Sequence, residues 1–122
     1  MKKITTVFAL IITMIVATNS NTLQAQESGF SEVKIKTSAV CDMCKETLEK
    51  AMAFEKGVKR SSLDVDSKIL TVTYNPKKTT VEKIRLAVTK AGYDADEIPA
   101  NNKAYDKLDA CCKKGAVCND KK

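Results

Sequence analysis

The sequence predicts an α+β domain of the ferredoxin-like type, in which two helices pack on one face of a four-stranded antiparallel sheet. Short segments alternate apolar and polar residues, which is typical of strands with a single buried face. Two other segments carry apolar residues at helical spacing. Their order is β-α-β-β-α-β, and this order predicts the sandwich.

The expected elements are short and are separated by recognisable turns. The four strands are predicted at residues 30–37, 58–65, 69–74 and 93–98. The first helix should start at Cys44, after a loop, and the second at Thr79, which forms a capping box with Glu82. Each helix is expected to stop at a glycine, Gly57 or Gly92, because glycine suits the left-handed turn after a helix.

The predicted domain, residues 26–98, lies between two segments of different composition. Residues 1–25 have the layout of a secretory signal peptide: two lysines, an apolar run and a small residue at position 25. An uncleaved anchor is the alternative, but the run of about 14 apolar residues is shorter than the ~20 that cross a bilayer. We therefore expect a periplasmic or secreted protein.

Residues 99–122 form a cysteine-containing C-terminal extension. Asn101 or Asn102 can cap a short helix, in which Ala104, Leu108 and Cys111 recur on one face. The polar, basic residues after it do not continue this pattern.

Composition excludes several classes of function. The formal charge is +6, but basic residues are interleaved with acidic ones and no arginine-rich stripe is present, which argues against nucleic-acid binding. The 122 residues include no histidine, so the commonest general base and nitrogen ligand are missing. We expect neither enzyme activity nor a small-molecule substrate.

Cys41 and Cys44 are the best candidates for a functional site. Cysteines three positions apart, where a loop enters a helix, can aim both sulfurs at one point. The positive end of the helix favours thiolate, the form that binds metal. Two thiolates suit soft ions, Cu(I) above all, with Hg(II), Zn(II) or Cd(II) as alternatives. Because a structural zinc site needs four ligands, this pair indicates an open site that can exchange its ion.

This arrangement resembles the heavy-metal-associated domain family, which includes copper chaperones and the periplasmic mercury-binding protein. The likeness covers roughly residues 31–98, and four short motifs carry it. They are the Cys-x-x-Cys of residues 41–44, Gly-Val at 57–58, Thr-Val-Thr-Tyr-Asn-Pro at 71–76 and Ala-Gly-Tyr at 91–93. The resemblance implies that Cys41 and Cys44 are the metal ligands and that Tyr93 lies close to the metal loop.

One motif departs from the family pattern. The family usually has Gly-Met two and three positions before the first cysteine, where this chain has Ser38 and Ala39. The methionine of the family packs under the metal loop. Ala39 is too small for that role, and we expect Met43 to fill part of the space.

The extension carries a second cluster, Cys111, Cys112 and Cys118. These cysteines can fold back and add thiolates to the first pair, in which case a four-sulfur site for zinc or cadmium becomes competitive. They can also form a separate metal store, or a disulfide with one thiol left over. Spacing alone does not decide among these alternatives.

Two rival functions use the same cysteines. A Cys-x-x-Cys pair also occurs in thiol-disulfide redox proteins, and a plain disulfide could stabilise an interaction module that binds no metal. The metal hypothesis implies transfer to a partner thiolate through shared-ligand intermediates. A metal-transporting membrane protein is a fitting partner, and the carrier is expected to be a monomer or a metal-bridged dimer.

Overall fold

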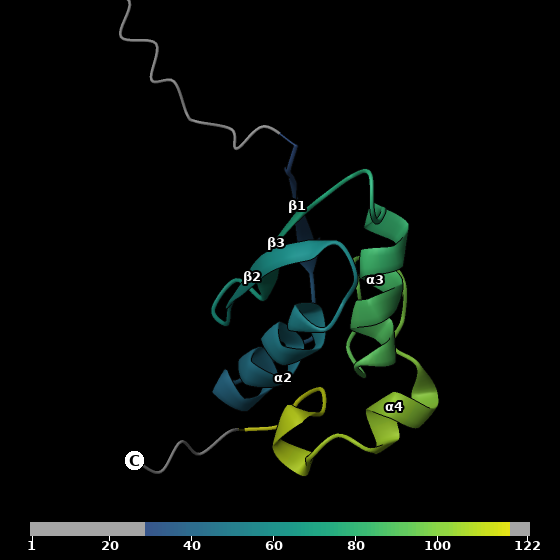
Figure 1. Ribbon diagram of the computed structural model, residues 1–122. Coiled ribbons are helices and arrows are strands. Elements are labelled where there is room, and N and C mark those ends of the chain that lie inside the picture. The colour runs from purple at the N-terminus through teal and green to yellow at the C-terminus, as the bar shows by residue number, and fades with distance from the viewer. Residues whose placement is uncertain (1–28, 118–122) are drawn as a thin grey trace, which may run out of the picture.

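The computed structural model describes residues 29–117 of the chain (Figure 1). The predicted signal peptide, residues 1–25, and Cys118 lie outside the described residues. The described elements, in chain order, are β1 (Ser31–Lys36), α2 (Asp42–Ala53), β2 (Val58–Asp64), β3 (Ile69–Tyr74), α3 (Val81–Lys90), α4 (Asn102–Asp106) and the 3₁₀ turn η2 (Ala110–Cys112). None of the helices in this part of the chain is long and apolar enough to cross a membrane.

The sheet has three strands in the order β1-β3-β2, and both pairings are antiparallel. Leu70 of the central strand lies opposite Ile35 on one side and Leu63 on the other. All three side chains are buried, because alternate residues of each strand face the helices. This row fixes the register, since a shift by one residue would turn the apolar side chains toward water.

Helix α2 begins two residues earlier than the sequence predicted. Cys41 is its N-cap, in an extended conformation (φ −155°, ψ 175°), and Asp42 stands in the first turn. The Lys45 N–H donates to the Cys41 carbonyl over 3.1 Å, which closes the first helical turn. The prediction placed the start at Cys44 because Cys41 lacks the side-chain oxygen that usually marks a cap. The helix packs on β2 and buries Leu48 and Met52.

Helix α3 starts at Val81, and its cap is Thr80 rather than the predicted Thr79. The Thr80 hydroxyl accepts from the Lys83 N–H over 3.3 Å, while Thr79 is buried. Ile84 and Val88 complete the core against α2 and the sheet. The helix ends before Gly92, whose φ of +101° is the left-handed conformation that the sequence predicted there.

The predicted fourth strand, residues 93–98, is absent from the described sheet. Ala95 makes single bridges to Thr37 and to Ile98, so the chain turns back on itself instead of extending beside β1. Asp96 has a positive φ of 54°. Its carboxylate accepts hydrogen bonds from the Lys36 N–H (2.9 Å) and from the Arg85 side chain (2.8 Å). A left-handed residue inside the segment interrupts a strand ladder.

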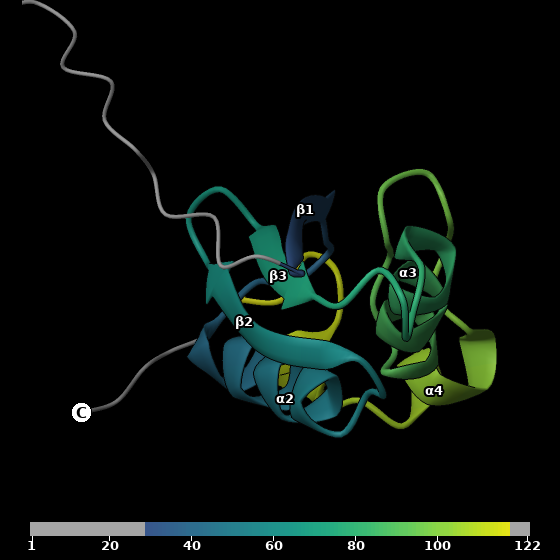
Figure 2. The ribbon, with the colours of Figure 1, turned by 45° about the horizontal axis from the view of Figure 1, so that its top comes forward.

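The extension returns to the domain instead of leaving it. Helix α4 is capped by Asn101, whose side chain accepts from the Ala104 N–H, but the helix ends at Asp106. Leu108 and Cys111 therefore lie beyond the helix that was predicted to contain them. Figures 1 and 2 both show the yellow end of the described chain folding back beside α2.

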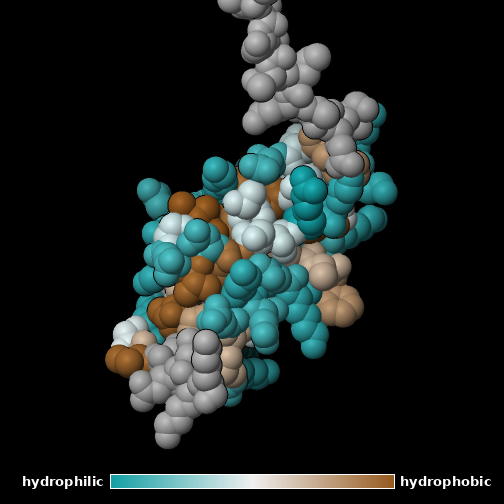
Figure 3. Space-filling model, turned by 90° about the vertical axis from the view of Figure 1, so that its left-hand side faces the viewer, coloured by the Kyte–Doolittle hydropathy of each residue, from teal (hydrophilic) through white to brown (hydrophobic). Residues whose placement is uncertain are grey.

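Some apolar side chains remain at the surface. Figure 3 shows a broken band of hydrophobic side chains on an otherwise hydrophilic face, close to where the chain leaves the described residues. The large apolar residues that are exposed come from different parts of the chain: Met43, Phe54, Leu86, Ile98 and Val117. Scattered exposure of this kind is ordinary for a small domain.

Candidate metal centre

The loop before Cys41 is held from two directions. The Thr37 hydroxyl donates to the Lys68 carbonyl over 3.0 Å and accepts from the Ala39 N–H over 3.3 Å. The Ser38 hydroxyl accepts from the Asp94 N–H over 2.9 Å. Ala39 is fully buried. These contacts fix the path of the backbone into the cysteine loop from the side of β3 and from the segment after α3.

The Cys41 and Cys44 side chains point toward each other. Their Sγ atoms are 3.4 Å apart, and no disulfide joins any two of the four cysteines in the described part of the chain. Cys41 is the N-cap of α2 and Cys44 lies in its first turn, so both sulfurs sit at the positive end of the helix. Cys44 is fully buried and Cys41 is 4% exposed. The two sulfurs therefore converge, but both are shielded from solvent.

The cover is the turn η2 of the extension. The Cys41 thiol donates to the Cys111 carbonyl over 3.8 Å, across 70 residues of sequence. The sulfurs of Cys41, Cys111 and Cys112 all lie within 4.8 Å of one another. Cys112 is buried at 4% exposure, whereas Cys111 is half-buried. The fold thus brings two of the three predicted tail cysteines to the first pair, and Cys118 lies outside the described residues.

Met43 does not fill the space beneath the loop, and that prediction was wrong. Its side chain is 48% exposed, because Met43 stands on the outer side of the first turn of α2. The Met43 Sδ instead accepts from the Cys111 thiol over 3.5 Å. The thioether is therefore a neighbour of the tail cysteines.

Tyr93 is fully buried beside the thiols. Its hydroxyl makes no hydrogen bond of ordinary geometry within residues 29–117, and its polar neighbours are the thiols of Cys44 and Cys112. Burial, and after it those two thiols, raises the pKa of Tyr93 well above its usual range. Burial, and then the contact with Cys44, likewise raises the pKa of the Cys112 thiol. In the metal-free protein Cys112 is therefore protonated at neutral pH.

A few polar contacts and one close packing contact hold the extension in place. The Lys114 ammonium pairs with the Asp94 carboxylate over 2.7 Å, and the Lys114 N–H donates to the Tyr105 hydroxyl over 3.1 Å. Leu108 packs against the core, directly over Gly92. These contacts lie on both sides of η2 along the chain, so they fix the position of the turn.

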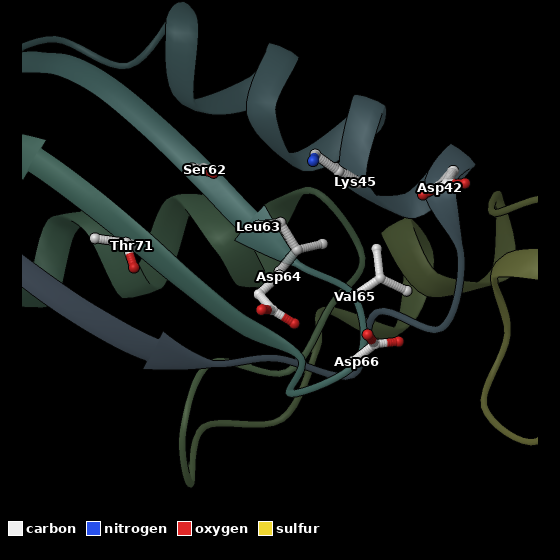
Figure 4. Close-up of a pocket in the computed structure, with 8 residues that line it drawn as sticks. All are labelled: Asp42, Lys45, Ser62, Leu63, Asp64, Val65, Asp66 and Thr71. Atoms are coloured by element: carbon white, nitrogen blue, oxygen red, sulfur yellow. The ribbon is translucent and has the colours of Figure 1, made fainter.

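An open hollow lies beside the start of α2 and is lined mostly by polar groups (Figure 4). Asp42 and Lys45 border it from the helix, Asp64 from the end of β2 and Asp66 from the turn that follows. Asp64 accepts from the Ser67 N–H over 2.9 Å, which shapes that turn. Within residues 29–117, the group of side chains placed to share a metal ion consists of cysteines, not of these carboxylates.

A helix-on-sheet sandwich with two convergent thiols at the first strand–helix junction defines a class of small metal-carrying domains. This chain belongs to the heavy-metal-associated domain family, whose pattern matches residues 37–94. The family resemblance predicted from the sequence is thereby confirmed. Its relatives include a copper chaperone and a component of mercuric transport, both metal carriers by name.

Two relatives show the breadth of the family. Over 54 residues the chain is 33% identical to the copper chaperone CopZ of Staphylococcus haemolyticus, which covers 44% of this chain and 79% of that protein. Over 83 residues it is 31% identical to the mercuric transport protein periplasmic component of Shewanella putrefaciens, which covers 68% and 88%. The crystal structure of oxidized MerP from Ralstonia metallidurans CH34 is also similar, with a TM-score of 0.53 and 26% identity. That match covers 55% of this chain and 94% of MerP.

Proposed function

We propose that this protein is an exported carrier or buffer of a soft metal ion, which it holds through the thiolates of Cys41 and Cys44. The observation that carries the proposal is the 3.4 Å approach of the two sulfurs at the start of α2. A metal–sulfur bond of about 2.3 Å lets one ion bridge sulfurs up to about 4.6 Å apart. The loop therefore needs only a small side-chain movement to take up an ion.

The chemistry of the donors selects thiophilic ions. The chain has no histidine, so nitrogen ligands of that type are missing and sulfur dominates. Cu(I) is the ion that a two-thiolate loop suits best, and Hg(II), Zn(II) and Cd(II) follow. The names of the relatives, a copper chaperone and a mercuric transport protein, support this range.

Transfer of the ion is a ligand exchange. A thiolate of the partner attacks the bound ion, a shared-ligand intermediate forms, and Cys41 or Cys44 is released as the partner takes over. No covalent bond of a substrate is made or broken. A metal-transporting membrane protein is a fitting partner, because it must receive its ion directly from the thiolates of a carrier and not from solution.

Export rests on residues 1–25, whose composition is that of a signal peptide. The similarity to a periplasmic component of mercuric transport supports the same compartment. We accordingly place the carrier in the periplasm or an equivalent exported space.

The test is metal loading of the reduced protein without oxygen. The chain should bind Cu(I) or Hg(II), and the C41S/C44S double variant should lose this binding. Ala53→Ser is a matched control, since it adds a hydroxyl at an exposed position of the same helix. If the double variant binds both ions as tightly as the parent, the proposed function is wrong.

A second candidate is a thiol-disulfide redox protein, and the same 3.4 Å separation favours it. Little movement brings the sulfurs to the ~2.05 Å of a disulfide. An insulin-reduction assay separates the two functions. Appreciable turnover that disappears in C41S/C44S would support redox activity, whereas metal binding without turnover supports the carrier.

A further inference from the structure

Cys111 and Cys112 are adjacent in the chain, yet both sulfurs approach the sulfur of Cys41. All three lie within 4.8 Å of one another, although Cys41 is 70 residues from Cys111. Successive side chains of a 3₁₀ turn normally point in different directions, about 120° apart. If the turn served only to fill space, one buried apolar side chain would be enough. Convergence of both thiols on a third is what a metal site requires.

The spacing of the sulfurs fits a coordinated ion. With metal–sulfur bonds of about 2.3 Å, sulfurs around one ion lie about 3.8 Å apart in a tetrahedron and about 4.0 Å apart in a trigonal plane. The Cys41–Cys44 distance is 3.4 Å, and the separations among Cys41, Cys111 and Cys112 do not exceed 4.8 Å. Shifts of at most about 1 Å bring the sulfurs of Cys41, Cys111 and Cys112 to coordination distances, and Cys44 is linked to this group through its contact with Cys41.

The surroundings are those of a closed site. Cys41, Cys44 and Cys112 are each at most 4% exposed, so water reaches these three sulfurs poorly, whereas Cys111 is half-buried. The salt bridge between Lys114 and Asp94 and the packing of Leu108 over Gly92 hold the turn on both sides. A metal site of three or four thiolates that excludes water holds its ion more firmly than an open loop.

We propose that Cys111 and Cys112 are metal ligands, which join Cys41 and Cys44 so that one ion is held by at least three sulfurs of a single chain. The extension thereby closes the open two-cysteine loop. The ligand class is a thiophilic divalent cation that prefers four sulfurs, Zn(II) or Cd(II), because a two-cysteine loop is already complete for Cu(I). Each cysteine gives its proton to water as the ion enters. The inference rests on the proposed function, since Cys41 and Cys44 belong to the same ligand set.

The test uses Cd(II) and Zn(II) as probes on the reduced full chain, without oxygen, in competition with a chelator. In C111S/C112S the Cd(II) and Zn(II) affinities should fall by more than about 100-fold, because loss of a group outside the coordination sphere already costs about 10–100-fold. Cu(I) affinity should change far less. Ala110→Ser is the matched control, an exposed position in the same turn, and it should behave as the parent.

Counting the sulfurs bound to the ion tests the proposal on the parent protein. This measurement does not depend on Cys112→Ser, which changes a buried side chain of the turn. X-ray absorption of the Zn(II)-loaded parent should show three or four sulfurs at about 2.3 Å. The half-buried Cys111→Ser should lower that count by one. Two sulfurs completed by oxygen or nitrogen would overturn the proposal, and so would a full count found only in a metal-bridged dimer by analytical ultracentrifugation.

The two proposals fail differently. One result is unchanged Cd(II) and Zn(II) binding in C111S/C112S together with lost Cu(I) binding in C41S/C44S. It would refute the proposal that the extension supplies ligands and would support the proposed carrier function. Unchanged binding of every ion in C41S/C44S would overturn the carrier itself.

Discussion

Gly92 couples the core to the extension, and replacing it with alanine should damage both. Its φ is +101°, which an alanine adopts only with strain. A Cβ at this position would lie 3.0 Å from the Ala104 carbonyl oxygen and 3.0 Å from the Leu108 Cγ. The substitution therefore pushes against α4 and against the side chain that packs the extension on the core.

The expected loss has two parts. The left-handed backbone costs about 1 kcal/mol, and overpacking in a filled space costs about 1–3 kcal/mol. Gly92→Ala should thus lower the free energy of unfolding by about 2–4 kcal/mol. Gly115→Ala is the matched control: its φ is +77°, but nothing lies within 4 Å of the added Cβ. That variant should lose about 1 kcal/mol or less.

Urea denaturation of the reduced, metal-free protein measures both losses. The rate at which a thiol reagent modifies Cys112 provides a second readout, because Cys112 is buried only while the turn is docked. Gly92→Ala should speed this modification and Gly115→Ala should not. Equal stability losses in the two variants, or a Cys112 that is no more reactive in Gly92→Ala, would refute the reasoning.

Three further perturbations test other parts of the structure. Burial raises the pKa of Asp96, but hydrogen bonds from the Lys36 backbone and from Arg85 outweigh it, so the net pKa lies below the usual value. Asp96 therefore stabilises the fold above pH ~4, and this contribution is lost as the pH falls through its folded pKa; Asp96→Asn should flatten the acid limb of a urea-stability profile. Leu48→Ala, at a fully buried site, should cost about 2–5 kcal/mol in urea denaturation. Tyr93→Phe removes a buried hydroxyl without an ordinary hydrogen bond, so the metal-free stability should be unchanged or rise by up to about 1 kcal/mol.

Each of these has its own control or contrary result. Leu86→Ala, at a site that is 50% exposed, should cost clearly less than Leu48→Ala, and equal losses would mean that the assigned core is wrong. An Asp96→Asn profile as steep as that of the parent would place the acid sensitivity elsewhere. A Tyr93→Phe variant that loses more than about 1 kcal/mol would show that the thiols satisfy the hydroxyl well.

The sequence predicted the elements best where side chains alternate or repeat strongly. The predicted third strand, residues 69–74, coincides with β3, since its alternation of apolar and threonine residues leaves one register. The start of α2 was missed because a cysteine N-cap carries no hydrogen-bonding oxygen as a signal. The fourth strand failed because the left-handed Asp96 arises from hydrogen bonds to Lys36 and Arg85, which are distant in sequence.

The candidate site, like the fold, could be predicted only in part from the sequence. The spacing of Cys41 and Cys44 at a loop-to-helix junction is a local feature, so the sequence could predict that their sulfurs converge. The position of Cys111 and Cys112 depends instead on where Leu108 and Lys114 dock, and no short-range pattern encodes that. The sequence left the role of the tail cysteines open for this reason. Their assignment as ligands stays a prediction until the sulfurs are counted.

Carrying and releasing an ion place opposite demands on the extension. A docked turn that buries Cys41 and Cys44 keeps a bound ion from water, but it also blocks the approach of a partner thiolate. Within the described chain, the contacts that hold the turn are few and partly exposed, such as the salt bridge between Lys114 and Asp94. Segments held in this way open locally at a small fraction of the free energy of global unfolding. For the proposed carrier, transfer can therefore proceed while the sandwich stays folded, and its rate should follow the opening of the extension rather than the stability of the core.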